Sequence, residues 1–241
     1  MSPPMLAIQN LSAWYGAARI LFDLDLEVRR GEVVALMGRN GAGKSTTMKA
    51  IMGLVERRGR VVFNGDDISR LKPYEIARRG LGLTPEDRRI FSDLTVMENL
   101  DIGRQPPRQF ADGTVAPLFT PDVLFKLFPN LAEMPNRPGG RMSGGEQQML
   151  TVARTLMGNP YLLLLDEPSE GVSPLILEQM VDTILTLKEQ GLSLLLSEQN
   201  VHFARLVSDR AYILEKGQLR WQGSMADLDC AGEVQRTYLT V

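Results

Sequence analysis

The glycine-rich segment GRNGAGKS at residues 38–45 constrains the fold of this 241-residue chain more than any other feature. It matches the pattern G-x-x-x-x-G-K-[ST], in which successive backbone N–H groups surround a phosphate group. The apolar run EVVALM precedes it, and an amphipathic helical pattern follows it. Strand, loop and helix in this order predict an α/β fold whose loop holds nucleotide phosphates at the N-terminus of the helix.

Two side chains of this loop and two acids further along the chain predict the chemistry. Lys44 can reach the β- and γ-phosphates, and the Ser45 hydroxyl can bind Mg²⁺. Asp166 ends the apolar run YLLLLD, where its carboxylate can hold Mg²⁺ directly or through water. Glu167 follows it and suits a general base, since an idle carboxylate so near the phosphates would only repel them. These residues predict a magnesium-dependent nucleotide hydrolase.

Hydrophobic periodicity predicts how the rest of the chain is organised. Residues 5–16, 19–32 and 58–68 alternate apolar and polar side chains, as half-buried antiparallel strands do. The middle third is mainly helical, and the last third alternates strand and helix before a hairpin at 211–223. Because buried apolar strands that alternate with helices form parallel sheets, we expect an α/β P-loop NTPase core of mostly parallel sheet with an N-terminal antiparallel part.

Composition narrows the class of partner. A formal net charge of -2 offers no basic excess for a phosphodiester backbone, so we expect no nucleic acid partner. The single cysteine, Cys230, excludes an internal disulfide and fits a reducing cytoplasm. The first residues do not match a signal peptide. The longest apolar run, residues 161–165, is far shorter than the ~20 residues of a membrane helix. If the protein works at a membrane, another chain must span it.

A second motif narrows the nucleotide hydrolases to one family. MSGGEQQ at residues 142–148 is similar to the signature of ABC transporter ATPases, and Tyr15 in WYG resembles the aromatic residue that stacks on adenine. The segments GRNGAGKST, YLLLLDEP and SDRAYILEKGQL follow in that family's order, so the resemblance covers essentially the whole chain. PEDRRIFSDLTVMENL, MSGGEQQML and SEQN resemble most closely the ATPase of branched-chain amino acid importers, the LivF type.

The resemblance implies one ABC ATPase domain over residues 1–241. An ATP-binding core would comprise 1–85 and 158–241, and a helical signature subdomain 86–157. Two ATPase subunits would face each other head to tail, each nucleotide lying between the loop of one and the signature of the other. The signature residues are consistent with this arrangement, because the free N–H groups at the N-terminus of their helix form a second anion site. The expected contacts to ATP come from Tyr15, Gly38, Arg39, Asn40, Gly41, Ala42, Gly43, Lys44, Ser45, Thr46, Ser143, Gly144 and Gly145, and those to Mg²⁺ from Ser45, Glu86 and Asp166.

The resemblance also implies a switch residue, usually histidine, after the strand that follows YLLLLDEP. That strand is predicted at 193–197, and the switch position then falls on Gln199 and not on His202, the only histidine. A glutamine amide can donate a hydrogen bond to the γ-phosphate but cannot carry a proton. His202 is expected to be a packing or surface residue. Catalysis is therefore assigned to Lys44, Glu167 and Gln199.

Two further departures from the family pattern lie at the same site. Glu86 stands where glutamine is common, and Ser173 stands where aspartate is common. A glutamate can still bind Mg²⁺, although it adds negative charge near ATP. Glutamate and glutamine at positions 86 and 199 recur in the LivF type, so they support that subfamily.

We therefore expect the ATPase subunit of an ABC importer, bound peripherally at the cytoplasmic face of the inner membrane. Its expected partners are permease subunits, a second ATPase that is a copy or a paralogue, and indirectly a periplasmic binding protein. Branched-chain amino acids are the favoured cargo, with urea and short amides compatible. The alternatives are a soluble ABC ATPase outside transport and a nucleotide-binding regulator without turnover.

Overall fold

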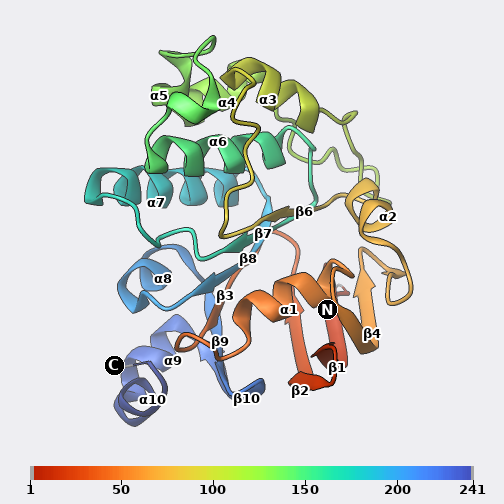
Figure 1. The fold of residues 1–241 in the computed structure, drawn as a ribbon. Coiled ribbons are helices and arrows are strands. Elements are labelled where there is room, and N and C mark those ends of the chain that lie inside the picture. The colour runs from red at the N-terminus through yellow and green to blue at the C-terminus, as the bar shows by residue number, and fades with distance from the viewer. Residues whose placement is uncertain (1–2, 240–241) are drawn as a thin grey trace.

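The computed structural model describes residues 3–239, so the ends of the predicted domain, residues 1–2 and 240–241, lie outside the described range. Two sheets and a layer of helices make up the fold (Figure 1). The strands are β1 Leu6–Tyr15, β2 Ala18–Val28, β3 Val33–Met37, β4 Glu56–Phe63, β5 Asp66–Asp67, β6 Leu81–Thr84, β7 Leu162–Asp166, β8 Ser193–Glu198, β9 Arg210–Glu215 and β10 Gln218–Ser224. The helices are α1 Lys44–Ile51, α2 Pro73–Arg78, α3 Val96–Gly103, α4 Pro121–Leu127, α5 Pro129–Ala132, a 3₁₀ turn Gly139–Arg141, α6 Gly144–Leu156, α7 Pro174–Glu189, α8 Val201–Val207, α9 Met225–Cys230 and α10 Gly232–Tyr238.

The larger sheet has the strand order β10-β9-β3-β8-β7-β6. Every neighbouring pair is parallel except β10 with β9. The smaller sheet, β2-β1-β4-β5, is antiparallel. The predicted α/β class, with a mostly parallel sheet and an N-terminal antiparallel part, is confirmed.

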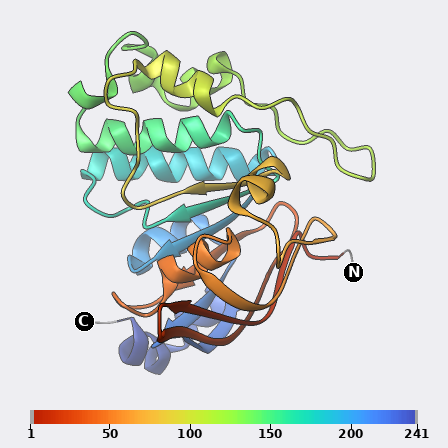
Figure 2. The ribbon, with the colours of Figure 1, turned by 45° about the vertical axis from the view of Figure 1, so that its right-hand side comes forward.

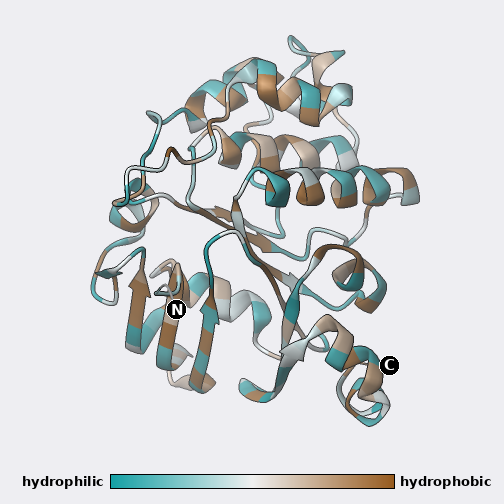
Figure 3. Cartoon of the chain, turned by 180° about the vertical axis from the view of Figure 1, so that it is seen from behind, coloured by the Kyte–Doolittle hydropathy of each residue, from teal (hydrophilic) through white to brown (hydrophobic). Residues whose placement is uncertain are grey.

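The larger sheet has an apolar core on each face. One core lies between the two sheets and includes Met48 and Ile51 of α1. The other packs the opposite face of the sheet against α6, α7 and α8. The middle strands of this sheet are strongly apolar, whereas the helices alternate apolar and polar surfaces (Figure 3). This double burial explains why β3 is wholly apolar in sequence and why β7 and β8 contain runs of leucine, at residues 162–165 and 194–196.

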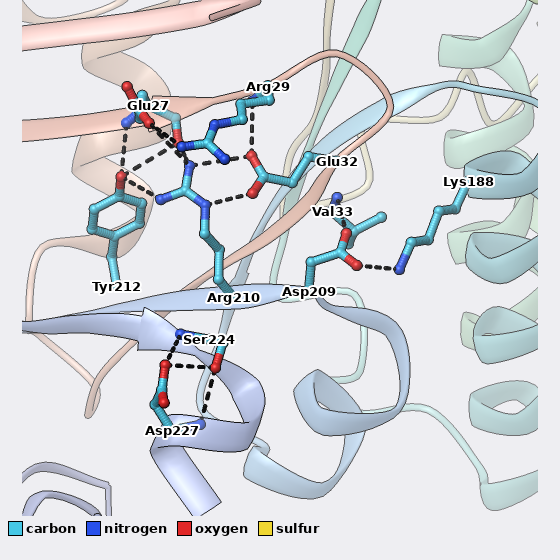
Figure 4. Close-up of polar contacts among 10 residues, drawn as sticks. All are labelled: Glu27, Arg29, Glu32, Val33, Lys188, Asp209, Arg210, Tyr212, Ser224 and Asp227. Carbon is cyan, nitrogen blue, oxygen red and sulfur yellow. Dashed lines mark hydrogen bonds and ion pairs between the residues drawn. The ribbon is translucent and has the colours of Figure 1, made fainter. Parts of the chain in front are cut away.

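A polar network fixes β9 against β3, the strand that leads into the phosphate loop (Figure 4). Arg210 donates to Glu32 and to the Tyr212 hydroxyl; burial lowers the pKa of Arg210, but these hydrogen bonds outweigh it and keep that pKa above its usual range. Asp209 accepts from the Val33 N–H at 3.0 Å and from the Lys188 ammonium at 2.6 Å. These contacts hold the start of β3 from both sides.

Three features of the fold differ from the sequence-based expectation. Strand β6 was not predicted, because four residues of mixed polarity carry little periodic signal. Helices α9 and α10 after the hairpin were also not predicted. Strand β8 ends at Glu198, one residue later than expected, so Gln199 is the first residue after it.

The segment between α3 and α4 leaves the helical layer and extends along the side of the molecule (Figure 2), where Asp112 pairs with Arg30 at 2.7 Å.

Candidate nucleotide site

The phosphate loop adopts a backbone that only glycine tolerates at two of its positions. Gly38 and Gly43 have φ angles of 149° and 109°. A Cβ on Gly38 would lie 2.4 Å from the Leu214 carbonyl oxygen, and one on Gly43 would lie 2.9 Å from the Leu21 side chain. The loop connects β3 to α1, whose first residue is Lys44. The predicted order of strand, loop and helix is confirmed.

Lys44 is buried and already paired. Its Nζ lies 2.9 Å from Glu167 Oε1, with both side chains at most 5% exposed. The same Nζ donates to the Gly38 and Arg39 carbonyl oxygens at 2.8 and 3.2 Å. The lysine expected to bind the phosphates is therefore paired with the acid expected to act as base. No sequence pattern indicated this pairing.

Glu167 sits in a strained and poorly solvated position. Its φ of 50° places a non-glycine residue in the left-handed region. Its Oε2 is buried and has no hydrogen-bond partner within residues 3–239. Burial raises the pKa of Glu167, although Lys44 opposes the rise. A carboxylate with one unpartnered oxygen and a raised pKa suits proton abstraction.

Asp166, at the end of β7, accepts hydrogen bonds from two hydroxyl groups on the same carboxylate oxygen. Ser45 Oγ donates to Asp166 Oδ1 at 2.9 Å, and Ser197 Oγ donates to the same atom at 2.6 Å. Ser197 Oγ also accepts from the Glu167 N–H at 3.0 Å. The parallel register of β7 and β8 places Asp166 opposite Ser197. Ser197 is thus a residue of the site that the sequence patterns did not identify.

The side-chain oxygens of Ser45 and Asp166 fit a magnesium ion bound beside phosphates. Mg²⁺ prefers hard oxygen ligands and is usually held by one or two carboxylates together with phosphate oxygens and water. Ser45 Oγ and Asp166 Oδ1 are such oxygens, 2.9 Å apart. Residues 3–239 contain no group of three or more His, Cys, Asp or Glu side chains that could hold a metal. The protein would supply a hydroxyl and a carboxylate, and the nucleotide would supply the rest.

Two neighbouring cavities gather most of the predicted residues. In the first, of about 420 Å³, Tyr15 is 47% exposed, which leaves a ring face free for a base. The second, of about 550 Å³, contains Gln199. Asn40 and Glu170 line both cavities, so Gln199 lies beside the phosphate loop. The first is lined by Tyr15, Ile20, Asn40, Gly41, Gly43, Lys44, Ser45, Thr46, Glu86, Glu167 and Glu170, and the second by Gly38, Arg39, Asn40, Ser169, Glu170, Gln199, Asn200 and Leu239.

The signature residues lie outside both cavities. Ser143 caps α6, accepting from the Glu146 N–H at 3.3 Å while Glu146 accepts from the Ser143 N–H at 2.7 Å. The guanidinium of Arg88 lies beside Gly144, where a Cβ would be 2.8 Å from it. The fold therefore does not bring Ser143, Gly144 and Gly145 onto the phosphate loop of the same chain. Arg88, which adds positive charge at this helix N-terminus, was not predicted.

The segment after β8 places the two candidates for the switch residue, Gln199 and His202, in different environments. Gln199 is half-buried and lines a cavity, whereas His202 is exposed on α8. Glu198, the last residue of β8, is fully buried, and burial raises its pKa to about 7 against the effect of hydrogen bonds from Ser169 and Asn200. The expectation that His202 is a packing or surface residue is consistent with its exposure. A buried Glu198 was not expected from the sequence.

Comparisons with known proteins agree with this geometry. The ABC transporter family model matches residues 21–170. The high-affinity branched-chain amino acid transport ATP-binding protein BraG of Pseudomonas aeruginosa is 40% identical over 98% of this chain and 99% of its own. The lipopolysaccharide export system ATP-binding protein LptB of Haemophilus influenzae is 35% identical over 98% and 97%. The ADP conformation of MJ1267, an ATP-binding cassette of an ABC transporter, has a TM-score of 0.79 with 26% identity and covers 98% of this chain and 97% of its own.

Proposed function

Because the chain belongs to the ABC transporter family, whose ATPase subunits hydrolyse ATP to power transport, we propose that it drives the import of branched-chain amino acids. The observation that supports this choice of cargo is the 40% identity to BraG over nearly the full length of both chains. The predicted family and enzymatic activity are confirmed by the same comparisons. Within residues 3–239, none of the helices has the length and apolar character that a membrane span requires.

The site supports a division of labour among its residues during hydrolysis. Tyr15 stacks on adenine, and the loop N–H groups and Lys44 bind the phosphates. Binding of the γ-phosphate draws Lys44 away from Glu167, which frees that carboxylate. Glu167 then accepts a proton from the water whose oxygen attacks the γ-phosphorus, and ADP leaves with the electrons of the broken P–O bond.

Two further groups complete the proposed site. Gln199 donates a hydrogen bond to a γ-phosphate oxygen. Mg²⁺, held by Ser45 and Asp166 with Glu86 nearby, would neutralise charge on the phosphates when bound. Since Ser143, Gly144 and Gly145 lie outside both cavities, they are proposed to bind the nucleotide of a second ATPase subunit.

The proposed assembly follows from these two separate anion sites. The core, residues 1–85 and 158–241, binds ATP, and the helical subdomain, 86–157, presents the signature to a partner ATPase. Closure of that dimer around ATP would move permease subunits, to which a periplasmic binding protein delivers the amino acid. The chain would then lie at the cytoplasmic face of the inner membrane.

Uptake in a host that lacks its own branched-chain importer ATPase tests the proposal. The chain and the permease genes beside it are expressed, and uptake of radiolabelled leucine, isoleucine and valine is measured with labelled urea as a comparison. Leucine uptake that requires the chain and is abolished by Glu167→Gln supports the proposal. Uptake of urea alone, or restoration of lipopolysaccharide export in an LptB-depleted strain without leucine uptake, would contradict the amino acid assignment.

A further inference from the structure

Glu198 is a buried carboxylate without a basic partner. It is the last residue of β8 and is 0% exposed. Within the described residues, 3–239, no lysine or arginine forms an ion pair with it. A carboxylate removed from water and not paired with a cation is costly unless several hydrogen bonds compensate. The position of this carboxylate therefore needs an explanation other than simple packing.

Four donors from two separate segments converge on its oxygens. Oε1 accepts from the Ser169 N–H at 3.0 Å. Oε2 accepts from the Ser169 hydroxyl at 2.9 Å and from the N–H groups of Gln199 and Asn200 at 3.1 Å each. Ser169 lies two residues after Glu167, and Gln199 directly follows Glu198. One carboxylate thus connects the loop that carries the catalytic base to the segment that carries the switch residue.

The loop that carries Glu167 needs an external restraint. Glu167 has the strained φ of 50°, a conformation that persists only when surrounding contacts impose it. The N–H of Glu167 donates to Ser197 Oγ at 3.0 Å, which restrains the main chain on the N-terminal side of that residue. Glu198 restrains the same loop after Glu167, through Ser169. The end of β8 therefore fixes the loop on both sides of the base.

We propose that Glu198 is a positioning residue for ATP hydrolysis that fixes the main chain at Gln199 relative to Glu167. The inference rests on the proposed roles of Glu167 and Gln199. Both act on the same γ-phosphate: Glu167 acts through the attacking water, and Gln199 through a hydrogen bond to a phosphate oxygen. An error of about 1 Å in such an arrangement can reduce turnover by about 100-fold. Glu198 acts on the reaction through these two residues and touches neither nucleotide nor water.

Glu198→Gln tests this role in the complete transporter, purified by a tag on this chain. An amide offers one acceptor oxygen and a donor group in place of the second oxygen, so some of the four donors lose their partner. We expect kcat to fall by about 10- to 100-fold while KM for ATP changes by less than about twofold, because orientation is lost and binding is not. Asp227→Asn is the matched control, since Asp227 also binds the N–H and hydroxyl of a serine, Ser224, outside the site.

A double-mutant cycle with Gln199→Ala separates positioning from a general effect. If Glu198 acts through Gln199, the double variant should be no more than about threefold slower than the slower single variant. Losses that multiply, an unchanged kcat in Glu198→Gln, or a raised KM with unchanged kcat would each overturn the proposal. Wild-type turnover in Gln199→Ala would instead contradict the proposed role of Gln199 itself, and the positioning role with it.

Ser169→Ala keeps the test decisive if Glu198→Gln does not fold. This substitution removes one hydroxyl donor and leaves the carboxylate and the Ser169 N–H in place. We expect kcat to fall several-fold with KM unchanged and thermal stability close to that of the wild type. Wild-type kcat in a folded Ser169→Ala protein would show that the link from Glu198 to the loop does not position the base.

Discussion

Glu167→Gln should tighten nucleotide binding as well as stop hydrolysis. Glu167 competes with the γ-phosphate for Lys44, because the Lys44 Nζ lies 2.9 Å from Glu167 Oε1. The substitution removes that competition and one negative charge beside the phosphates. Lys44 keeps its contacts to the Gly38 and Arg39 carbonyl oxygens, so the loop retains its shape.

The distance gives the scale of the effect. At 2.9 Å and an effective dielectric constant of about 20, two unit charges attract each other by about 6 kcal/mol. Burial of each ion costs several kcal/mol, which cancels most of that attraction. A net competition of about 1–2 kcal/mol remains, and this corresponds to about 5- to 30-fold tighter binding of a non-hydrolysable ATP analogue. Loss of the base should slow turnover by about 10²- to 10⁴-fold.

Titration calorimetry with Mg²⁺ and the analogue measures the first effect, and phosphate release measures the second. Glu170→Gln is the matched control, because Glu170 lines the same cavity without bonding to Lys44. It removes the same charge and should tighten binding by less. Unchanged or weaker binding in Glu167→Gln would refute the competition, and equal tightening in both variants would assign the effect to net charge alone.

Two other predictions concern Glu198, at the end of β8, and the segment that follows it. Gln199→Ala should lower turnover with nucleotide affinity nearly unchanged, whereas His202→Ala should leave both unchanged because His202 is exposed; the reverse result in phosphate-release assays would make the histidine the working residue. The unfolding free energy should fall by up to about 3 kcal/mol as pH rises from about 4.5 to about 7, because the folded Glu198 carboxyl, with a pKa of about 7, holds a proton that the unfolded chain releases earlier. Urea denaturation at pH 5, 6 and 7 should show this slope in the wild type and not in Glu198→Gln, and parallel profiles would contradict the buried titration.

The local motifs could be predicted because their geometry is written in consecutive residues. The phosphate loop needs glycine at fixed positions between a strand and a helix, and α6 and α7 begin at serine caps that the sequence displays. Burial on both faces made the centres of β7 and β8 apolar, at residues 162–165 and 194–196, which indicated a parallel sheet before its order was known. The short strand β6 and the terminal helices α9 and α10 lacked so clear a pattern and were missed.

By itself, the sequence determined the fold class, and it predicted the residues that meet ATP and the choice of Gln199 over His202. Only the tertiary structure decided how these residues act on one another. The pairing of Lys44 with Glu167 depends on β3 and β7 flanking β8 in one sheet. The convergence of Ser45 and Ser197 on Asp166 depends on the register of β7 with β8. Such contacts join residues far apart in the chain, so their energies arise from strand order and burial, which no local pattern encodes.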